Sequence, residues 1–79
     1  MARDEEITRI NKEIARLLKE ARDQSGLSKN ALAQKAGVSV QTISFLEGGV
    51  NSPSISTFIR ICGALSVAPD ALLAEAKQS

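Results

Sequence analysis

The sequence contains no histidine, no tryptophan and no tyrosine, and its single cysteine is Cys62. Histidine is the commonest general base and a common zinc ligand, so its absence argues against an enzyme or a metal centre. A lone cysteine cannot form an internal disulfide or supply a cysteine-rich metal site. No apolar run approaches the ~20 residues that span a bilayer, and the charged N-terminus is unlike a signal peptide. We therefore expect a cytoplasmic protein that has no catalytic residues, no metal, no cofactor and no membrane contact.

An excess of charge of one sign is also lacking. The 79 residues carry 10 Lys and Arg against 9 Asp and Glu, which gives a net charge of +1. Charge alone therefore indicates neither a nucleic acid nor a membrane partner. Hydrophobic residues make up 43% of the chain and prolines number only 2, which favours a folded domain over disorder. We expect one domain over residues 1–79.

Apolar residues recur at helical spacing, and nowhere do they alternate as in a strand. Serines precede, and glycines follow, several of the periodic segments, as is typical of helix caps. The expected helices cover about residues 4–25, 29–36, 40–47, 55–65 and 69–73, and residues 74–79 are expected to fray. Leu72 and Leu73 are expected to face inward. The side chains expected to converge in one core are Leu32, Ile43, Leu46, Phe58, Ile61 and Leu65.

The segment from Ser28 to Glu47 has the spacing of a helix-turn-helix unit. Two short helices flank a turn that contains Gly37, and the second helix could enter a major groove about 12 Å wide. The same spacing also fits an ordinary helical hairpin within a bundle. Spacing alone therefore leaves DNA binding and a purely structural hairpin as alternatives.

The residue pattern narrows this choice. The run Gly26-Leu27-Ser28-x-x-x-Leu32-Ala33-x-x-Ala36-Gly37-Val38-Ser39-x-x-Thr42-Ile43-Ser44-x-Leu46-Glu47-x-Gly49 resembles the phage-repressor and Cro type of helix-turn-helix domain, the XRE-like family. The resemblance covers residues 14–73, with residues 1–13 as an N-terminal extension of the first helix and 74–79 as a tail. It implies an all-α, compact, five-helix, lambda-repressor-like DNA-binding domain whose second and third helices form the helix-turn-helix.

The resemblance also implies roles for individual residues. The base-facing positions of the recognition helix, residues 39–47, correspond to Val40, Gln41, Ser44 and Phe45. The phosphate-facing positions correspond to Ser28, Lys29, Ser39, Thr42, Asn51 and Ser52. Arg22 and Glu47 match a pair that relatives form between the first and third helices, and we expect them to form a structural ion pair. Gln41 can donate and accept together, which matches the edge of adenine, and Val40 can cover a thymine methyl.

The chain departs from the family pattern in its charges. From Ala36 to Ile59 the only charged residue is Glu47, whereas relatives commonly place Lys or Arg after that glutamate. Phosphate contacts supply most non-specific affinity for DNA, so we expect modest affinity and a shallow salt dependence. Phe45 is a large apolar residue at a base-facing position, where it can pack on thymine methyls or belong to a protein-binding patch. The basic residues of the first helix alternate with acids and are interpreted as a solvated face with local ion pairs.

The sequence leaves two classes of function open. The first is a sequence-specific DNA-binding transcriptional regulator that acts as a homodimer on a pseudo-palindromic site in double-stranded DNA. The second is a protein-interaction module that keeps the helix-turn-helix fold and has lost DNA binding. The stripe Ile7, Ile10 and Ile14 is expected to cap the core, with a dimer contact as the alternative, and the C-terminal helix with its two leucines is the competing dimer surface. The sequence identifies no effector.

Overall fold

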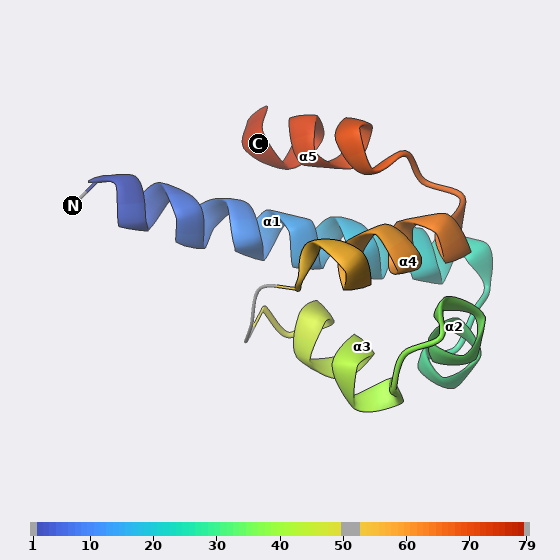
Figure 1. Cartoon of the computed structure of the whole chain (residues 1–79). Coiled ribbons are helices and arrows are strands. Elements are labelled where there is room, and N and C mark those ends of the chain that lie inside the picture. The colour runs from blue at the N-terminus through green and yellow to red at the C-terminus, as the bar shows by residue number, and fades with distance from the viewer. Residues whose placement is uncertain (1, 50–52, 79) are drawn as a thin grey trace.

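The structure, a computed structural model, describes residues 2–49 and 53–78 of the chain. These residues form five helices and no strand: α1 (Ala2–Ser25), α2 (Lys29–Ala36), α3 (Val40–Glu47), α4 (Ile55–Leu65) and α5 (Pro69–Gln78). Short links join the helices, and Figure 1 shows α1, α4 and α5 above the α2–α3 pair. The predicted all-α fold with five helices is confirmed.

The long first helix sets the shape of the molecule. It begins at Ala2, slightly before the predicted start near Asp4, and its 24 residues span about 36 Å at the usual helical rise. This length accounts for a longest dimension of 38 Å, against 22 Å and 20 Å in the other two directions. Helix α5 runs back along α1 in the opposite direction (Figure 1), and the Arg9 guanidinium donates a 3.1 Å hydrogen bond to the Lys77 carbonyl.

A helix that crosses a membrane must be about 20 residues long and mostly apolar. Within residues 2–49 and 53–78, no single helix is long and apolar enough to cross a membrane. Helices α4 and α5 reach the required length and composition only when they are taken together, with a bend of 103° between them.

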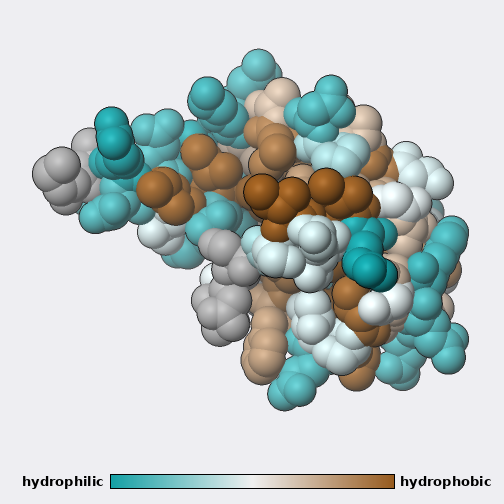
Figure 2. Space-filling model, in the orientation of Figure 1, coloured by the Kyte–Doolittle hydropathy of each residue, from teal (hydrophilic) through white to brown (hydrophobic). Residues whose placement is uncertain are grey.

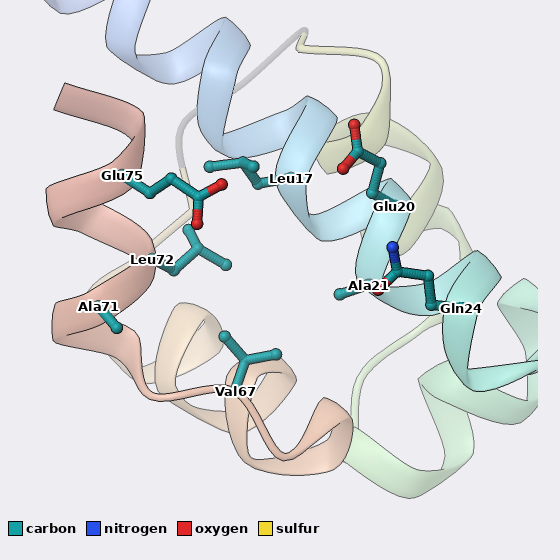
Figure 3. A pocket seen from close by; sticks show the side chains of 8 residues that line it. All are labelled: Leu17, Glu20, Ala21, Gln24, Val67, Ala71, Leu72 and Glu75. Carbon is teal, nitrogen blue, oxygen red and sulfur yellow. The ribbon is translucent and has the colours of Figure 1, made fainter. Parts of the chain in front are cut away.

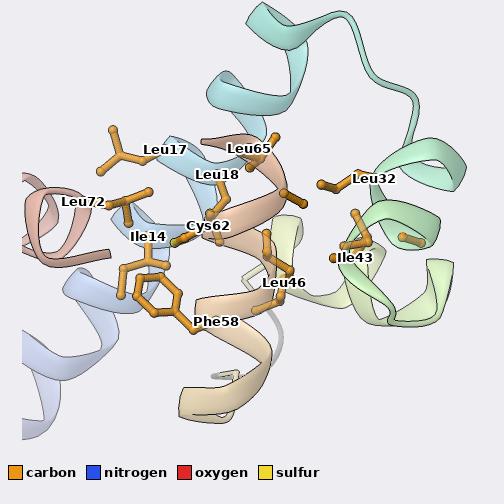
Figure 4. Packing of buried hydrophobic residues seen from close by; sticks show 14 of the residues in the cluster. Ile14, Leu17, Leu18, Leu32, Ile43, Leu46, Phe58, Cys62, Leu65 and Leu72 are labelled. Atoms are coloured by element: carbon orange, nitrogen blue, oxygen red, sulfur yellow. The ribbon is translucent and has the colours of Figure 1, made fainter. Parts of the chain in front are cut away.

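One hydrophobic core receives side chains from all five helices (Figure 4). The six residues predicted to converge are all buried in it, so the predicted core is confirmed. Its most enclosed large side chains are Leu18, Leu32, Ile43, Ile61 and Cys62. Burial raises the pKa of the Cys62 thiol, so this cysteine stays protonated and behaves as a small apolar residue.

Three of the helices end in the same way, and α1 does so at Gly26, which has a φ of 74°, with a 3.3 Å hydrogen bond from the Leu27 N–H to the Arg22 carbonyl. At the end of α2, Gly37 has a φ of 74°, and the N–H of Val38 donates to the Ala33 carbonyl at 3.0 Å. At the end of α4, Ser66 takes the equivalent place with a φ of 58°, and Val67 donates a 2.9 Å hydrogen bond back into the helix. All three ends are Schellman motifs, in which a left-handed residue precedes an apolar residue that packs on the core. Helix α4 therefore ends on a residue with a Cβ where α2 ends on glycine.

Replacing this serine by glycine is expected to stabilise the protein. A left-handed backbone costs an L-residue about 1 kcal/mol, and Ser66→Gly removes that strain. The greater conformational entropy of glycine in the unfolded chain offsets part of this gain in stability. The midpoint of thermal unfolding, followed by circular dichroism, should rise. Gly37→Ala is the matched control and should lower it, because alanine would be strained at the same φ. An unchanged or lower midpoint for Ser66→Gly would contradict this account of the α4 end.

Helix α5 corrects two expectations. The sequence predicts a fraying tail over residues 74–79, but the helix continues to Gln78. Ala76 is fully buried, and packing of this small residue against the core holds the last turns in place. The prediction that Leu72 and Leu73 both face inward is wrong for Leu73, which is 43% exposed. Neighbouring helical residues point about 100° apart, so α5 buries Leu72 and leaves Leu73 outside.

Candidate nucleic-acid interface

Helix α3 begins at a serine cap. The Ser39 Oγ accepts a hydrogen bond from the Thr42 N–H at 3.1 Å, and the two hydroxyl oxygens lie 2.9 Å apart. The cap gives a partner to one of the amide groups that the first helical turn leaves without one. It also holds Ser39 and Thr42, both predicted to face phosphates, side by side at the start of the helix.

Helix α3 has a buried inner face and an exposed outer face. Ile43 and Leu46 anchor the helix in the core (Figure 4). The residues predicted to face bases are all exposed: Val40, Gln41, Ser44 and Phe45. Phe45 is the largest of them, and 44% of it is open to solvent. The fold therefore presents these four side chains together on the outer face of α3.

The start of α2 carries the other predicted phosphate contacts that the structure describes. The Ser28 Oγ caps the helix by accepting a 3.0 Å hydrogen bond from the Ala31 N–H, and Lys29 follows as an exposed residue of the first turn. Asn51 and Ser52, also predicted to face phosphate, lie outside the described residues. Helices α2 and α3 have 8 residues each and are joined by the turn at residues 37–39. This arrangement defines a helix-turn-helix domain.

The structure brings Arg22 and Glu47 together as a bidentate ion pair between α1 and α3. The Arg22 Nε donates to Glu47 Oε2 at 2.6 Å, and the Arg22 Nη2 donates to Glu47 Oε1 at 3.0 Å. A third nitrogen, Nη1, donates to the Leu27 carbonyl at 2.9 Å. The hydrogen bond that Arg22 donates to Glu47 raises the pKa of Arg22, which is itself buried. The pair ties the end of the recognition helix to α1 and neutralises the only charge on α3.

The fold places two lysines beside the end of α3 that the sequence assigns only to a solvated face of the first helix. Lys12 and Lys19 of α1 line an open hollow of about 310 Å³ together with Gly48 and Gly49. A Cβ built on Gly49 would lie 3.9 Å from the Lys12 Cγ, so α1 and the residues just after α3 are in contact there. No local pattern could have identified these lysines, because more than two turns of helix and two links separate α1 from this end of α3. They add positive charge next to the recognition helix.

Two further basic residues have identified neighbours in the structure, Arg16 and Arg60. Arg16 of α1 forms an ion pair with Glu13 at 2.8 Å and a second one with Glu20. These contacts agree with the interpretation of the helix surface as a solvated face with local pairs. Arg60 of α4 lies beside the turn of the helix-turn-helix, since a Cβ built on Gly37 would lie 3.2 Å from its Nη1. The residue pattern alone gives no sign that Arg60 lies beside this turn.

A separate hollow of about 270 Å³ lies between α1 and α5 (Figure 3). Apolar and polar side chains line it: Leu17, Glu20, Ala21, Gln24, Val67, Ala71, Leu72 and Glu75. None of these residues belongs to α2 or α3. The hollow is therefore distinct from the outer face of the recognition helix.

Comparison with known families agrees with the geometry. The sequence model of the helix-turn-helix family HTH_3 matches residues 18–72, which is more than half of the chain. The chain therefore belongs to the HTH_3 helix-turn-helix family, and the resemblance to XRE-like domains is confirmed. A search of curated protein sequences gave no significant match.

Solved structures of transcriptional regulators share the fold. Two structures of the clp gene regulator ClgR from Corynebacterium glutamicum align with TM-scores of 0.80 and identities of 26% and 27%. The alignments cover 87% and 89% of this chain, and 73% and 90% of theirs. An HTH_3 family transcriptional regulator from Vibrio cholerae aligns with a TM-score of 0.79 and 35% identity, over 90% of this chain and 40% of its own.

Proposed function

We propose that this protein is a sequence-specific DNA-binding regulator of transcription that inserts α3 into the major groove. The observation that carries the proposal is the outer face of α3. Ile43 and Leu46 pack in the core on the inner face of this helix, and four side chains on its outer face are exposed. Membership of the HTH_3 family and the likeness to transcriptional regulators support it. Such a regulator works in the cytoplasm, needs no cofactor and catalyses no reaction.

The chemistry of the outer face suits base reading. Gln41 is exposed, and its amide can donate to and accept from the major-groove edge of adenine at once. Val40 and Phe45 offer apolar surface for thymine methyl groups, and the Ser44 hydroxyl can act as a donor or an acceptor. We therefore expect a recognition site with A·T pairs at the positions beneath Val40 and Gln41.

Phosphate binding is the weaker half of this interface. Ser28 and Lys29 at the start of α2, with Ser39 and Thr42 at the start of α3, are the described candidates, and only Lys29 carries a charge. We assign Asn51 and Ser52 to the same role on the family pattern. One copy with so few cations binds DNA weakly, whereas two linked copies on one duplex gain from each other's attachment. We therefore propose a homodimer on a pseudo-palindromic site.

The alternative function is a protein-interaction module. Phe45 favours it, because a large aromatic side chain is 44% exposed on a helix face whose one charge is already paired. Interfaces between proteins are enriched in exposed aromatic residues of this kind. Under this alternative the outer face of α3 binds a protein and the domain has no affinity for DNA.

Selection from a random pool of double-stranded DNA at low salt tests the proposal directly. A DNA-binding regulator should enrich a pseudo-palindrome, because two copies of α3 read two half-sites about one helical turn apart. Failure to enrich any sequence at low salt would contradict sequence-specific binding and favour the interaction module.

Substitutions at Gln41 and Lys29 should then separate base reading from phosphate binding. Gln41→Ala should lose about 1–3 kcal/mol on the selected site and little on random DNA. Lys29→Ala should weaken both and reduce the salt slope by about one unit. Gln34→Ala, at an exposed glutamine of α2, is the matched control and should change neither. Binding titrations at several salt concentrations measure all three, and an equal loss on both DNAs for Gln41→Ala would remove its base-reading role.

Phe45→Ala distinguishes the two functions. On a DNA reader this change removes an apolar base contact and reduces affinity for the selected site. In an interaction module it abolishes binding of the protein partner, and DNA binding is absent from the wild-type protein as well. The same titrations, run beside the Gln41 series, give the answer.

A further inference from the structure

An apolar face on α1, α4 and α5 remains exposed in the folded chain. Its most open side chains are Ile55 and Ile59 of α4, which are 78% and 52% exposed, and it continues through Ile7 of α1 and Leu73 of α5. Figure 2 shows hydrophobic side chains gathered in a band that runs from the N-terminal half of α1 across to α4. We call these four residues the α1–α4–α5 face.

The four residues belong to one continuous surface. Ile55 and Leu73 line a shared hollow of about 180 Å³, whose other walls include Asn11 of α1. Ile59 lies one helical turn after Ile55, and Ile7 lies one turn before Asn11, so each extends the hollow along its own helix. Ile7 and Leu73, one from each of the two dimer surfaces that the sequence leaves open, therefore meet in a single face, whereas Ile14 and Leu72 are buried in the core.

The face is as large as the largest apolar patch that a monomer usually leaves open. Its four side chains expose on the order of 400 Å² of apolar surface, which is as large as the largest patch on a typical monomer. Two such faces pressed together would remove about 800 Å² of apolar surface from water. A standard interface buries about 1,200–2,000 Å² in total, of which somewhat more than half is apolar. The face is therefore large enough for a stable dimer.

Its chemistry fits a second copy of the same chain. Between Gly48 and Ile59 the sequence has no charged residue, so the α4 parts of this face can meet in two copies without burying an unpaired charge. The same lack of cations makes the start of α4 unsuitable for DNA. Because a two-fold contact brings one surface against itself, an uncharged apolar face is self-complementary. The face includes no residue of α2 or α3, so its use leaves the outer face of the recognition helix uncovered.

We propose that the α1–α4–α5 face is the two-fold interface between two copies of this chain, with Ile55 and Ile59 at its centre. The choice of a second copy rests in part on the proposed function, which needs two recognition helices on one duplex. In this dimer the contact is made by the start of α4 together with Ile7 and Leu73, and not by α5 alone.

Sedimentation velocity of the whole chain without DNA tests the interface. The wild type should form dimers at about 0.1 mM, and Ile55→Glu should weaken dimerisation at least tenfold. Gln34→Glu adds the same charge at an exposed position of α2 and should leave dimerisation unchanged. Circular dichroism checks that each variant is folded, and Ile59→Glu repeats the test at the second central residue should Ile55→Glu lose helix.

The outcomes separate this proposal from the proposed function. A wild type that is monomeric at about 0.1 mM overturns the interface, and so does a folded Ile55→Glu variant that dimerises as tightly as the wild type. Dimers that Ile55→Glu separates, in a protein that enriches no DNA sequence, would uphold the interface and contradict the DNA-binding function.

Discussion

Phe58→Ala and Leu46→Ala are each expected to destabilise the protein by about 2–5 kcal/mol. Both side chains are buried in the single core, Phe58 on α4 and Leu46 on α3 (Figure 4). Leu46 packs in the same cluster as Leu32 and Ile61, so its loss leaves a cavity where α2, α3 and α4 meet. A domain of this size has a total stability of roughly 4–12 kcal/mol, so either change should remove a large part of that stability.

Urea and thermal unfolding followed by circular dichroism measure this effect. Ile55→Ala is the matched control, because it removes an apolar side chain of α4 that is 78% exposed. Its effect on the free energy of unfolding of the monomer should stay within about 0.5 kcal/mol. A midpoint unaltered by Phe58→Ala and by Leu46→Ala would contradict the packing of the five helices around one core.

The helix ends could be predicted from the sequence because short-range chemistry determines them. Ser28, Ser39 and Ser54 each accept a hydrogen bond from the amide three residues later, and Gly37 takes the left-handed conformation that ends α2. These contacts involve neighbours in the chain, so the residue types alone are sufficient to place them. The inner and outer faces of α3 follow from helical periodicity in the same way.

Features that depend on how helices pack could not be predicted. Leu72 and Leu73 are equally apolar, and only the packing of α5 against α1 and α4 decides which of them is buried. The burial of Ala76, which extends α5, has the same origin. The position of Lys12 beside Gly49 likewise depends on the crossing of α1 with the end of α3. In each case the deciding neighbour is far away in the sequence, where local patterns carry no information.

In the candidate interface, too, local features could be predicted from the sequence and features that depend on packing could not. The exposure of Gln41 and Phe45 was accessible from periodicity and from the family pattern, whereas the charge around them was not. The positive charge next to the end of α3 comes from α1, and the negative charge of Glu47 is taken up by Arg22. The electrostatic character of the recognition surface is thus a property of the folded domain rather than of the helix-turn-helix segment alone.

Breaking the ion pair between Arg22 and Glu47 should have an effect comparable with that of a core substitution. Glu47→Ala leaves the Arg22 guanidinium buried with the Leu27 carbonyl and with Asp23 at 3.5 Å as its remaining partners. Removing one member of a buried pair typically costs about 3–5 kcal/mol, because the other charge stays away from water without compensation. Glu20→Ala breaks an exposed pair with Arg16 and is the control, with an expected change below about 1 kcal/mol.

The double variant Arg22→Met with Glu47→Ala separates the pair from the burial of a lone charge. Since no charge remains to be buried, the double variant should recover part of the stability that Glu47→Ala loses. The double-mutant cycle, measured by urea unfolding, should give a coupling energy of about 1–3 kcal/mol. High salt should change this coupling energy little, because the pair is buried away from solvent and its ions. The exposed control pair should weaken at high salt. A coupling near zero would mean that Arg22 and Glu47 contribute separately, and that α3 is held against α1 by its apolar anchors alone.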